Sequence, residues 1–293
     1  MRIAIIGTGN AGSITLLQLI ANNFEHEIIV LDEHQGLAIS ALLDAGGAYP
    51  RHAQRAKIGK PEDVRSCDLV VVCAGVQMGP TDSPKSVLER NAAIVRDYLS
   101  IGLKTDACIV VIATPVDDLT AILAESGAFA NNRVIGFGGD LDTARLQYLL
   151  GQKTTEDVSS AVCIGEHGER TVPIYQPETD YFEVARNVRE VVKRITSEAG
   201  RPRNLSTGIW LSRLITTLTL QDDSQHVVCG FVPEYGLYLT WPRMINVEGI
   251  GRTVDIKPGT VAAGVLASLV EEKRAERPEL MSLSTRLFGR RNL

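Results

Sequence analysis

Long apolar runs are missing from this sequence of 293 residues, although hydrophobic residues make up 44% of it. No apolar segment approaches the roughly 20 residues that a membrane-spanning helix needs. The apolar stretch at residues 3–6 is too short for the core of a signal peptide and ends at Gly7. The sequence therefore gives no reason to expect a membrane as a partner, and we expect a cytoplasmic protein.

Cysteine is scarce, and an excess of positive charge is absent. The five cysteines are odd in number, no two have the spacing of a CxxC motif, and Cys73, Cys108 and Cys163 lie in apolar runs. We interpret them as buried, reduced thiols and expect neither a disulfide framework nor a bound metal. The formal net charge of −5 gives no reason to expect nucleic acid or an anionic membrane as a partner.

Strand-like and helix-like segments alternate over the first half of the chain. Arg2–Ile6 and Glu27–Leu31 predict buried strands, and apolar residues recur with helical spacing over Ala11–Asn22. The further predictions are strands over Leu69–Cys73, Cys108–Ile112 and Val134–Phe137 and a helix over Val87–Leu99. Because continuous β-branched runs alternate with helices, we expect a parallel, doubly wound α/β sheet of the Rossmann type.

The rhythm of the sequence changes after Phe137. The predicted helices here are Asp140–Leu150, Tyr181–Ala199, Leu205–Leu220 and Thr260–Leu287. The predicted strands are Val158–Ile164, Val227–Phe231, Leu237–Thr240 and Gly249–Ile256. This mixture predicts an α+β domain, and the chain is long enough for two domains. We therefore divide it into a dinucleotide-binding domain, residues 1–138, and a substrate domain, residues 139–293.

A glycine-rich turn connects the first predicted strand to the first predicted helix. Residues 7–12 read Gly-Thr-Gly-Asn-Ala-Gly. The first glycine permits a tight turn, the second lets the backbone approach a pyrophosphate, and the third lets the helix pack on the strand. Asp32 ends the next strand, where a carboxylate binds the ribose diol of NAD and repels the 2′-phosphate of NADP. We predict an NAD site; the alternative is a tight turn without a ligand.

Three residues of the second half could together move a hydride and a proton. Asp142 and Arg145 are three apart on a predicted helix, so they project from one face, and His167 lies in the glycine-flanked loop 165–168. Hydride transfer to a carbonyl needs a proton donor with a pKa near neutrality, such as histidine. A carboxylate would orient the ring, and an arginine would hold a substrate carboxylate. Taken singly, each residue also fits a helix-end charge, a surface ion pair or a loop position.

The complete set of motifs resembles the lactate/malate dehydrogenase family over nearly the whole chain. The matching segments are Ile5–Gly12, Val72–Val76, Glu89–Asn91, Pro115–Asp117, Asn132–Gly136, Leu141–Leu146 and Ile164–Gly168. The resemblance implies that His167 is the proton donor and acceptor, that Asp142 orients it, and that Arg145 anchors the α-carboxylate of the substrate. The predicted cofactor-binding residues are Gly7, Gly9, Asn10, Ala11, Gly12, Asp32, Gly75 and Thr114.

The sequence departs from the family pattern where a mobile loop should bring an arginine over the substrate carbonyl. Residues 79–85 read Gly-Pro-Thr-Asp-Ser-Pro-Lys; Pro84 matches the arginine position and Lys85 follows it. Gln77 stands where malate dehydrogenases carry a second loop arginine, and Thr114 replaces the asparagine of Asn-Pro-Val. We expect the loop Gln77–Lys85 to fold over the site without an arginine.

Loss of such a preorganised cation costs roughly 100- to 1000-fold in rate. Three explanations remain open: Lys85 replaces the arginine as a less directional cation, the substrate is an already cationic imine, or the family reaction is lost. We predict an NAD-dependent oxidoreductase for a small 2-hydroxy/2-oxo (or 2-imino) acid, specialised rather than acting on ordinary lactate or malate.

Two other functions remain possible from the sequence. One is a non-catalytic or regulatory NAD-binding protein on the same scaffold. The other is an enzyme that keeps NAD tightly bound as an internal redox agent. In each case the expected partners are small molecules and further copies of the chain, in a homodimer or homotetramer.

Overall fold

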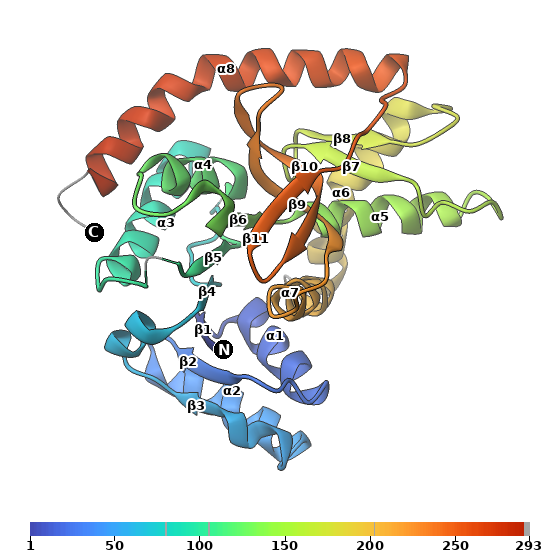
Figure 1. Ribbon diagram of the computed structural model, residues 1–293. Coiled ribbons are helices and arrows are strands. Elements are labelled where there is room, and N and C mark those ends of the chain that lie inside the picture. The colour runs from blue at the N-terminus through green and yellow to red at the C-terminus, as the bar shows by residue number, and fades with distance from the viewer. Residues whose placement is uncertain (80, 105, 202, 290–293) are drawn as a thin grey trace.

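The computed structural model describes residues 1–79, 81–104, 106–201 and 203–289 (Figure 1). One mixed sheet runs through both halves of the chain. Its strand order is β3-β2-β1-β4-β5-β6-β9-β10-β7-β8, and β11 pairs with β10. Helices lie on both faces of this sheet, as predicted from the alternating pattern (Figure 1).

The strands of the first half are parallel to one another. They are β1 (Arg2–Ile6), β2 (Glu27–Leu31), β3 (Ala56–Ile58), β4 (Leu69–Val72), β5 (Cys108–Val111) and β6 (Val134–Phe137). Every residue of β4, β5 and β6 is buried, which explains why these strands read as continuous apolar runs. The connecting helices are α1 (Asn10–Ala21), α2 (Gln35–Ala48), α3 (Pro84–Leu99) and α4 (Val116–Glu125), with short 3₁₀ helices η1 (His52–Arg55), η2 (Pro61–Ser66) and η3 (Asn131–Arg133).

The second half extends the same sheet with antiparallel strands. Its strands are β7 (Val162–Gly165), β8 (Thr171–Ile174), β9 (Ser224–Val232), β10 (Leu237–Asn246) and β11 (Gly249–Thr253). Its helices are α5 (Gly139–Gly151), α6 (Tyr181–Ala199), α7 (Leu205–Thr217) and α8 (Thr260–Phe288). Strand β9 pairs with β6, with Gly136 opposite Cys229. Because the sheet continues past residue 138, the two-domain boundary there stays a prediction.

The core divides into clusters on the two faces of the sheet. Alternate residues of β1 point to opposite faces: Ala4 and Ile6 belong to one cluster, and Ile3 and Ile5 to the other. A third cluster fills the space between β7, β8, β10, α6 and the first turns of α8. Helix α8 crosses the molecule from that third cluster to α3 and α4 (Figure 1). It therefore ties the two halves together.

Several predicted boundaries differ from the structure for local reasons. Helix α3 begins at Pro84 rather than Val87, because the Ser83 hydroxyl accepts the Ser86 amide at 3.2 Å and proline fits a first helical turn. Strand β7 begins at Val162 rather than Val158, since the Asp157 carboxylate accepts the Ser159 amide and forms a turn. The sequence prediction missed the short strands β3 and β8, the helix α2, which contains two adjacent glycines near its end, and the helix α4.

Gly136 marks the junction between the parallel and antiparallel parts of the sheet. A Cβ at this position would lie 2.3 Å from Thr120 Oγ1 and 2.8 Å from Cys229 Cβ. We predict that Gly136→Ala lowers the free energy of unfolding by about 1–3 kcal/mol, the usual cost of overpacking a core. The control is Gly264→Ala on α8, where a Cβ would have no described atom within 4 Å apart from the backbone of its own helix. Alanine should stabilise the helix there by roughly 0.5–1 kcal/mol. Urea denaturation measures both, and equal stability of the two variants would contradict the prediction.

Candidate active site

The turn between β1 and α1 has the geometry of a nucleotide-binding turn. Gly7 has a φ of +91°, and a Cβ there would lie 2.4 Å from the Ala74 nitrogen. A Cβ on Gly12 would lie 1.9 Å from the Gly7 oxygen, whereas a Cβ on Gly9 would have no atom within 4 Å. Gly7 and Gly12 are therefore required by close backbone packing. Gly9 leaves open space at the first turn of α1, where a pyrophosphate could reach the helix N–H groups.

The other predicted cofactor residues gather at the same edge of the sheet. Asn10 and Ala11 open α1, Gly75 follows β4, and Thr114 follows β5. The peptide bond between Thr114 and Pro115 is cis. All of them lie beyond the carboxyl ends of parallel strands, where ligands bind in sheets of this kind. These residues therefore fit a bound dinucleotide.

Asp32 lies beside the glycine-rich turn and is hydrogen-bonded to it. Its Oδ2 accepts the Thr8 amide at 2.7 Å and the Thr8 hydroxyl at 2.9 Å, and its Oδ1 accepts the His34 amide at 3.0 Å. The carboxylate is thus held at the end of β2 by donors from two loops. A ribose diol bound at Asp32 would share the carboxylate with these donors, and the role that the sequence predicts for Asp32 stays a prediction.

The structure brings the three predicted catalytic side chains together around one carboxylate. Asp142, only 2% exposed, accepts Arg145 Nη1 at 2.9 Å through Oδ1 and His167 Nδ1 at 2.7 Å through Oδ2. The Gly168 amide also donates to Oδ2, at 3.1 Å. Among the residues that the structure describes, none hydrogen-bonds the other ring nitrogen, Nε2. The dyad therefore fixes the tautomer and leaves Nε2 for a substrate.

Backbone geometry positions the imidazole of His167. A Cβ on Gly138 would lie 2.4 Å from His167 Cγ, so only a glycine at the end of β6 leaves room for the ring. Burial alone would lower the pKa of His167, but the charge and hydrogen bond of Asp142 outweigh burial and raise this pKa above 6.5. Burial would likewise raise the pKa of Asp142, but His167 and Arg145 hold it below its ordinary value. Each group thus stabilises the charged form of its neighbour.

Asp117 contacts the histidine loop, although the sequence predicted no role for it. Its buried carboxylate accepts the backbone amide of His167 at 3.0 Å through Oδ2 and the Thr240 hydroxyl at 2.8 Å through Oδ1. It thereby joins the start of α4 and the strand β10 to the histidine loop. The only sequence signal was its place in the segment Pro115–Asp117. We interpret Asp117 as a positioning residue for His167.

Asn91 likewise had no sequence signal beyond its place in the segment Glu89–Asn91. Its fully buried side chain accepts the Val76 amide at 2.7 Å and donates to the Val76 oxygen at 3.2 Å and the Thr114 oxygen at 2.7 Å. These bonds hold the segments that follow β4 and β5 side by side. Asn91 therefore shapes the floor of the predicted nucleotide site from α3.

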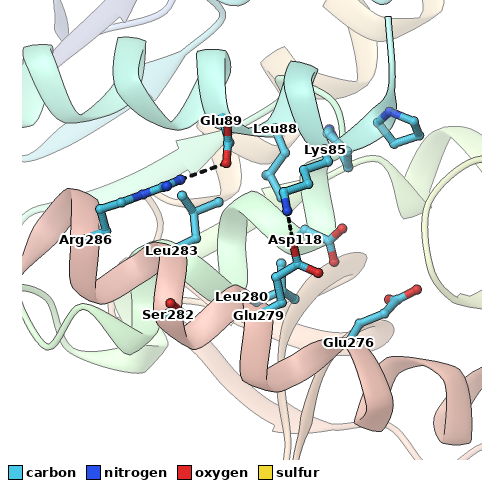
Figure 2. A pocket seen from close by; sticks show the side chains of 12 residues that line it. Lys85, Leu88, Glu89, Asp118, Glu276, Glu279, Leu280, Ser282, Leu283 and Arg286 are labelled. Carbon is cyan, nitrogen blue, oxygen red and sulfur yellow. Dashed lines mark hydrogen bonds and ion pairs between the residues drawn. The ribbon is translucent and has the colours of Figure 1, made fainter.

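The loop without an arginine leads directly into α3. Pro84 is the first residue of that helix, and Lys85, 67% exposed, forms an ion pair with Glu279 of α8. Figure 2 shows this pair beside a cavity of about 330 Å³ between α3, α4 and α8. None of the three candidate catalytic side chains, Asp142, Arg145 and His167, lines that cavity. Gln77 is exposed, and Pro80 lies outside the described residues.

A buried ion cluster supports the histidine loop from the side of α8. Lys273, 4% exposed, contacts Asp118 and lies 3.1 Å from Glu166, the residue before His167. Arg170 pairs with Glu166 and Glu276, each at 2.7 Å. Burial raises the pKa of Glu166, whereas the acidic neighbours of Lys273 outweigh its burial and raise its pKa. The cluster therefore couples α8 to the loop that carries the proposed acid.

Comparisons with known proteins agree with this geometry. The family described as "lactate/malate dehydrogenase, NAD binding domain" matches residues 1–136. An L-lactate dehydrogenase of Chloroherpeton thalassium is 27% identical over 282 residues, which are 88% of this chain and 92% of that protein.

Two solved structures share the fold. A lactate dehydrogenase from a Medee basin deep-sea metagenome library, 21% identical, superposes with a TM-score of 0.84 and covers 96% of this chain and 98% of its own. A malate dehydrogenase from Archaeoglobus fulgidus, solved with NADH, is 22% identical with a TM-score of 0.82, covering 96% of this chain and 99% of its own.

The raised pKa of His167 predicts a pH-dependent stability. Because the folded-state pKa is raised, the contribution of His167 is complete below the ordinary value of 6.5 and is lost as pH rises through the raised pKa. A tenfold difference in proton affinity between the folded and unfolded states corresponds to about 1.4 kcal/mol. We predict that the difference in unfolding free energy between the native protein and His167→Gln shrinks as pH rises above 6.5. Urea titrations at several pH values test this, and a difference that is constant or grows over that range would refute it.

Proposed function

We propose that this chain is an NAD-dependent oxidoreductase of the lactate/malate dehydrogenase family, and that it interconverts a small 2-hydroxy acid and its 2-oxo acid, or reduces a 2-imino acid to the 2-amino acid. The observation that carries this proposal is the dyad of His167 and Asp142, with Nε2 of the ring left for a substrate. Arg145, about one helical turn after Asp142, is paired with the same carboxylate. Its guanidinium supplies the cation that a carboxylate substrate needs. No helix of the described residues is long and apolar enough to span a membrane.

Each of the three residues His167, Asp142 and Arg145 has its own part in the proposed reaction. NADH held at the glycine-rich turn would supply the hydride for the carbonyl carbon. In this reductive direction His167 donates its Nε2 proton to the carbonyl oxygen. The imidazolium form of His167 is stabilised by Asp142, which stays ionised because its pKa is lowered. In the oxidative direction Nε2 takes the hydroxyl proton. The free N–H groups of Arg145 bind the substrate carboxylate and hold the reacting carbon in place.

In the proposed site the turn of Gly7, Gly9 and Gly12 holds the cofactor pyrophosphate, with Gly9 at the contact and Gly7 and Gly12 allowing the close backbone packing of the turn, and Asp32 is the proposed ribose partner. The open space at Gly9 supports this placement. We propose Asn10, Ala11, Gly75 and Thr114 as further contacts. An NAD molecule along these strand ends would extend from β2 toward β5, next to the histidine that follows β7.

We propose that the preferred substrate is not ordinary lactate or malate. Pro84 opens α3 and has no N–H to donate, so the position that matches the family's loop arginine offers no cation. Lys85 is the nearest candidate along the chain, but its ammonium is paired with Glu279. A substrate that carries its own positive charge, such as a 2-imino acid, would need this cation least. The intact arrangement of Asp142, Arg145 and His167 favours an active enzyme over a non-catalytic NAD-binding protein.

We also propose that the chain forms a homodimer or homotetramer and works in the cytoplasm. Helix α2 exposes three large apolar side chains, Leu37, Ile39 and Leu43, which a second copy of the chain could cover. A sedimentation mass equal to one chain would contradict this assembly.

Direct hydride transfer tests the proposed function. We expect deuterium from NADH labelled at C4 to enter a member of a panel of 2-oxo acids, with and without ammonium to form 2-imino acids. Pyruvate and oxaloacetate should react slowly, and His167→Asn should abolish transfer while NADH affinity changes little. Mass spectrometry of the products measures the transfer. Absence of label from every member of the panel, in a protein that binds NADH, would favour the non-catalytic alternative.

Two variants of the ion pair between α3 and α8 decide what Lys85 does. If Lys85 acts as the missing cation, Lys85→Ala should lower kcat by roughly 100-fold or more, whereas Glu279→Gln, which frees the ammonium, should leave kcat unchanged or raise it. If the pair only joins the helices, both variants should have the same small effect. Pro84→Arg should raise pyruvate or oxaloacetate reduction above the native rate. Steady-state kinetics measure all three, and native turnover of lactate or malate at ordinary enzyme rates would refute the specialised substrate.

A further inference from the structure

Arg243 on β10 is a buried cation without an acidic partner. Its side chain is 2% exposed, and within the described ranges no carboxylate lies at ion-pair distance from it. The other buried cation of the second half, Lys273, has acidic residues on several sides. Because an unpaired buried charge is costly, the setting of Arg243 calls for an explanation.

The hydrogen bonds of Arg243 use only a part of its guanidinium. Nη2 donates to the Gly230 oxygen at 2.9 Å and to the Phe231 oxygen at 2.8 Å. Nε is buried and has no hydrogen-bond partner among the residues that the structure describes. A guanidinium has five donors, so the two carbonyls leave capacity for an acceptor. Burial lowers the pKa of Arg243 to about 10, and the side chain therefore keeps its charge at neutral pH.

Two neighbouring strands, β9 and β11, flank Arg243 in the sheet. Arg243 lies opposite His226 of β9 and Thr253 of β11 in the sheet register. A Cβ on Gly230 would lie 3.5 Å from Nε and Cζ of Arg243 and 2.6 Å from Ile250 Cδ1. The missing side chain of Gly230 thus leaves the space that Ile250 occupies, and the guanidinium lies at van der Waals distance from it.

A cavity of about 340 Å³ opens beside this arginine, within the range of small-ligand pockets. The residues that line it are Asn131, Asn132, Phe231, Pro233, Arg243, Ile250, Gly251, Arg252 and Thr253. None of them is acidic, and Arg252 adds a second, exposed cation at the rim. The nearby carboxylate of Glu248 is paired with Arg133. The cavity therefore combines two cations with amide, hydroxyl and apolar groups.

This cavity is separate from the catalytic dyad. Asn131 and Asn132 belong to η3, which precedes β6, whereas Asp142 follows the carboxyl end of that strand. The two places thus lie at opposite ends of β6. Neither the glycine-rich turn nor His167 lines the cavity.

We propose that this cavity binds a small organic anion, a carboxylate or a phosphate ester, whose charge lies between Arg243 at the floor and Arg252 at the rim. Two guanidinium groups match the oxygens of either anion by charge-assisted hydrogen bonds. The side chains of Phe231, Pro233 and Ile250 would contact the carbon part of the ligand. The occupied site would join β10, β11 and η3 at the end of the sheet away from the dyad.

The test uses the full chain saturated with NADH, so that the nucleotide turn is occupied. Inorganic phosphate and succinate are titrated by calorimetry against sodium chloride of equal ionic strength, and the two anions distinguish the phosphate from the carboxylate class. Hydrogen exchange of β10 and β11 reports the place of binding. We expect one of the anions to bind and to protect these strands.

Variants connect the binding to the two arginines. Arg252→Gln, at the exposed rim, and Arg243→Lys, which keeps the charge but removes the planar fork, should each weaken the affinity by roughly tenfold or more. Arg274→Gln makes the same charge change on α8, where Arg274 pairs with Glu271, and should leave the affinity unchanged. Arg252→Gln keeps the test valid if Arg243→Lys does not fold. If neither anion binds better than chloride, or if the affinity survives Arg252→Gln, the proposal is overturned.

Discussion

The buried carboxylate of Asp142 is the interaction on which the candidate site depends. It accepts hydrogen bonds from Arg145, His167 and Gly168, and these groups come from α5 and from the loop after β7. A carboxylate so deeply buried stays ionised only if cations and hydrogen-bond donors compensate its charge. The same bonds that satisfy its charge also orient the ring of His167 and hold Arg145 beside it. The contacts that stabilise the buried charge of Asp142 are therefore the same contacts that orient the groups proposed for the reaction.

Contacts from several elements hold the loop of His167 within hydrogen-bond distance of Asp142. Asp117 binds the backbone of that loop from α4, and Gly138 gives the ring its space at the end of β6. On the other side, Lys273 of α8 holds Glu166, the preceding residue. Three elements that are far apart in the sequence thus converge on one short loop. A shift of α8 would therefore move Glu166 and with it the neighbouring His167, because Lys273 of α8 is paired with Glu166.

Much of the fold could be predicted because its signals are local. Continuous apolar runs predicted β1, β2 and β6 with their observed bounds, and the family motifs predicted that Asp142, Arg145 and His167 meet. The sequence prediction also missed four elements, α2, α4, β3 and β8. Helix α2 contains adjacent glycines, and β8 is short, so neither stood out. The roles of Asp117 and Asn91 were missed because a single buried polar residue has no pattern of its own.

The sequence by itself determined the glycine-rich turn, the candidate proton donor with its orienting carboxylate and the nearby cation, and the absence of an arginine at the matching loop position. Each of these features depends on residue types and on spacings of a few residues along the chain. They can therefore be identified before the fold is known. Only the tertiary structure decided that β9 continues the parallel sheet, that Lys85 meets Glu279, and that Arg243 is buried without an acid. These contacts join positions far apart in the chain or depend on burial between strands. They follow from packing and register, which no local pattern specifies.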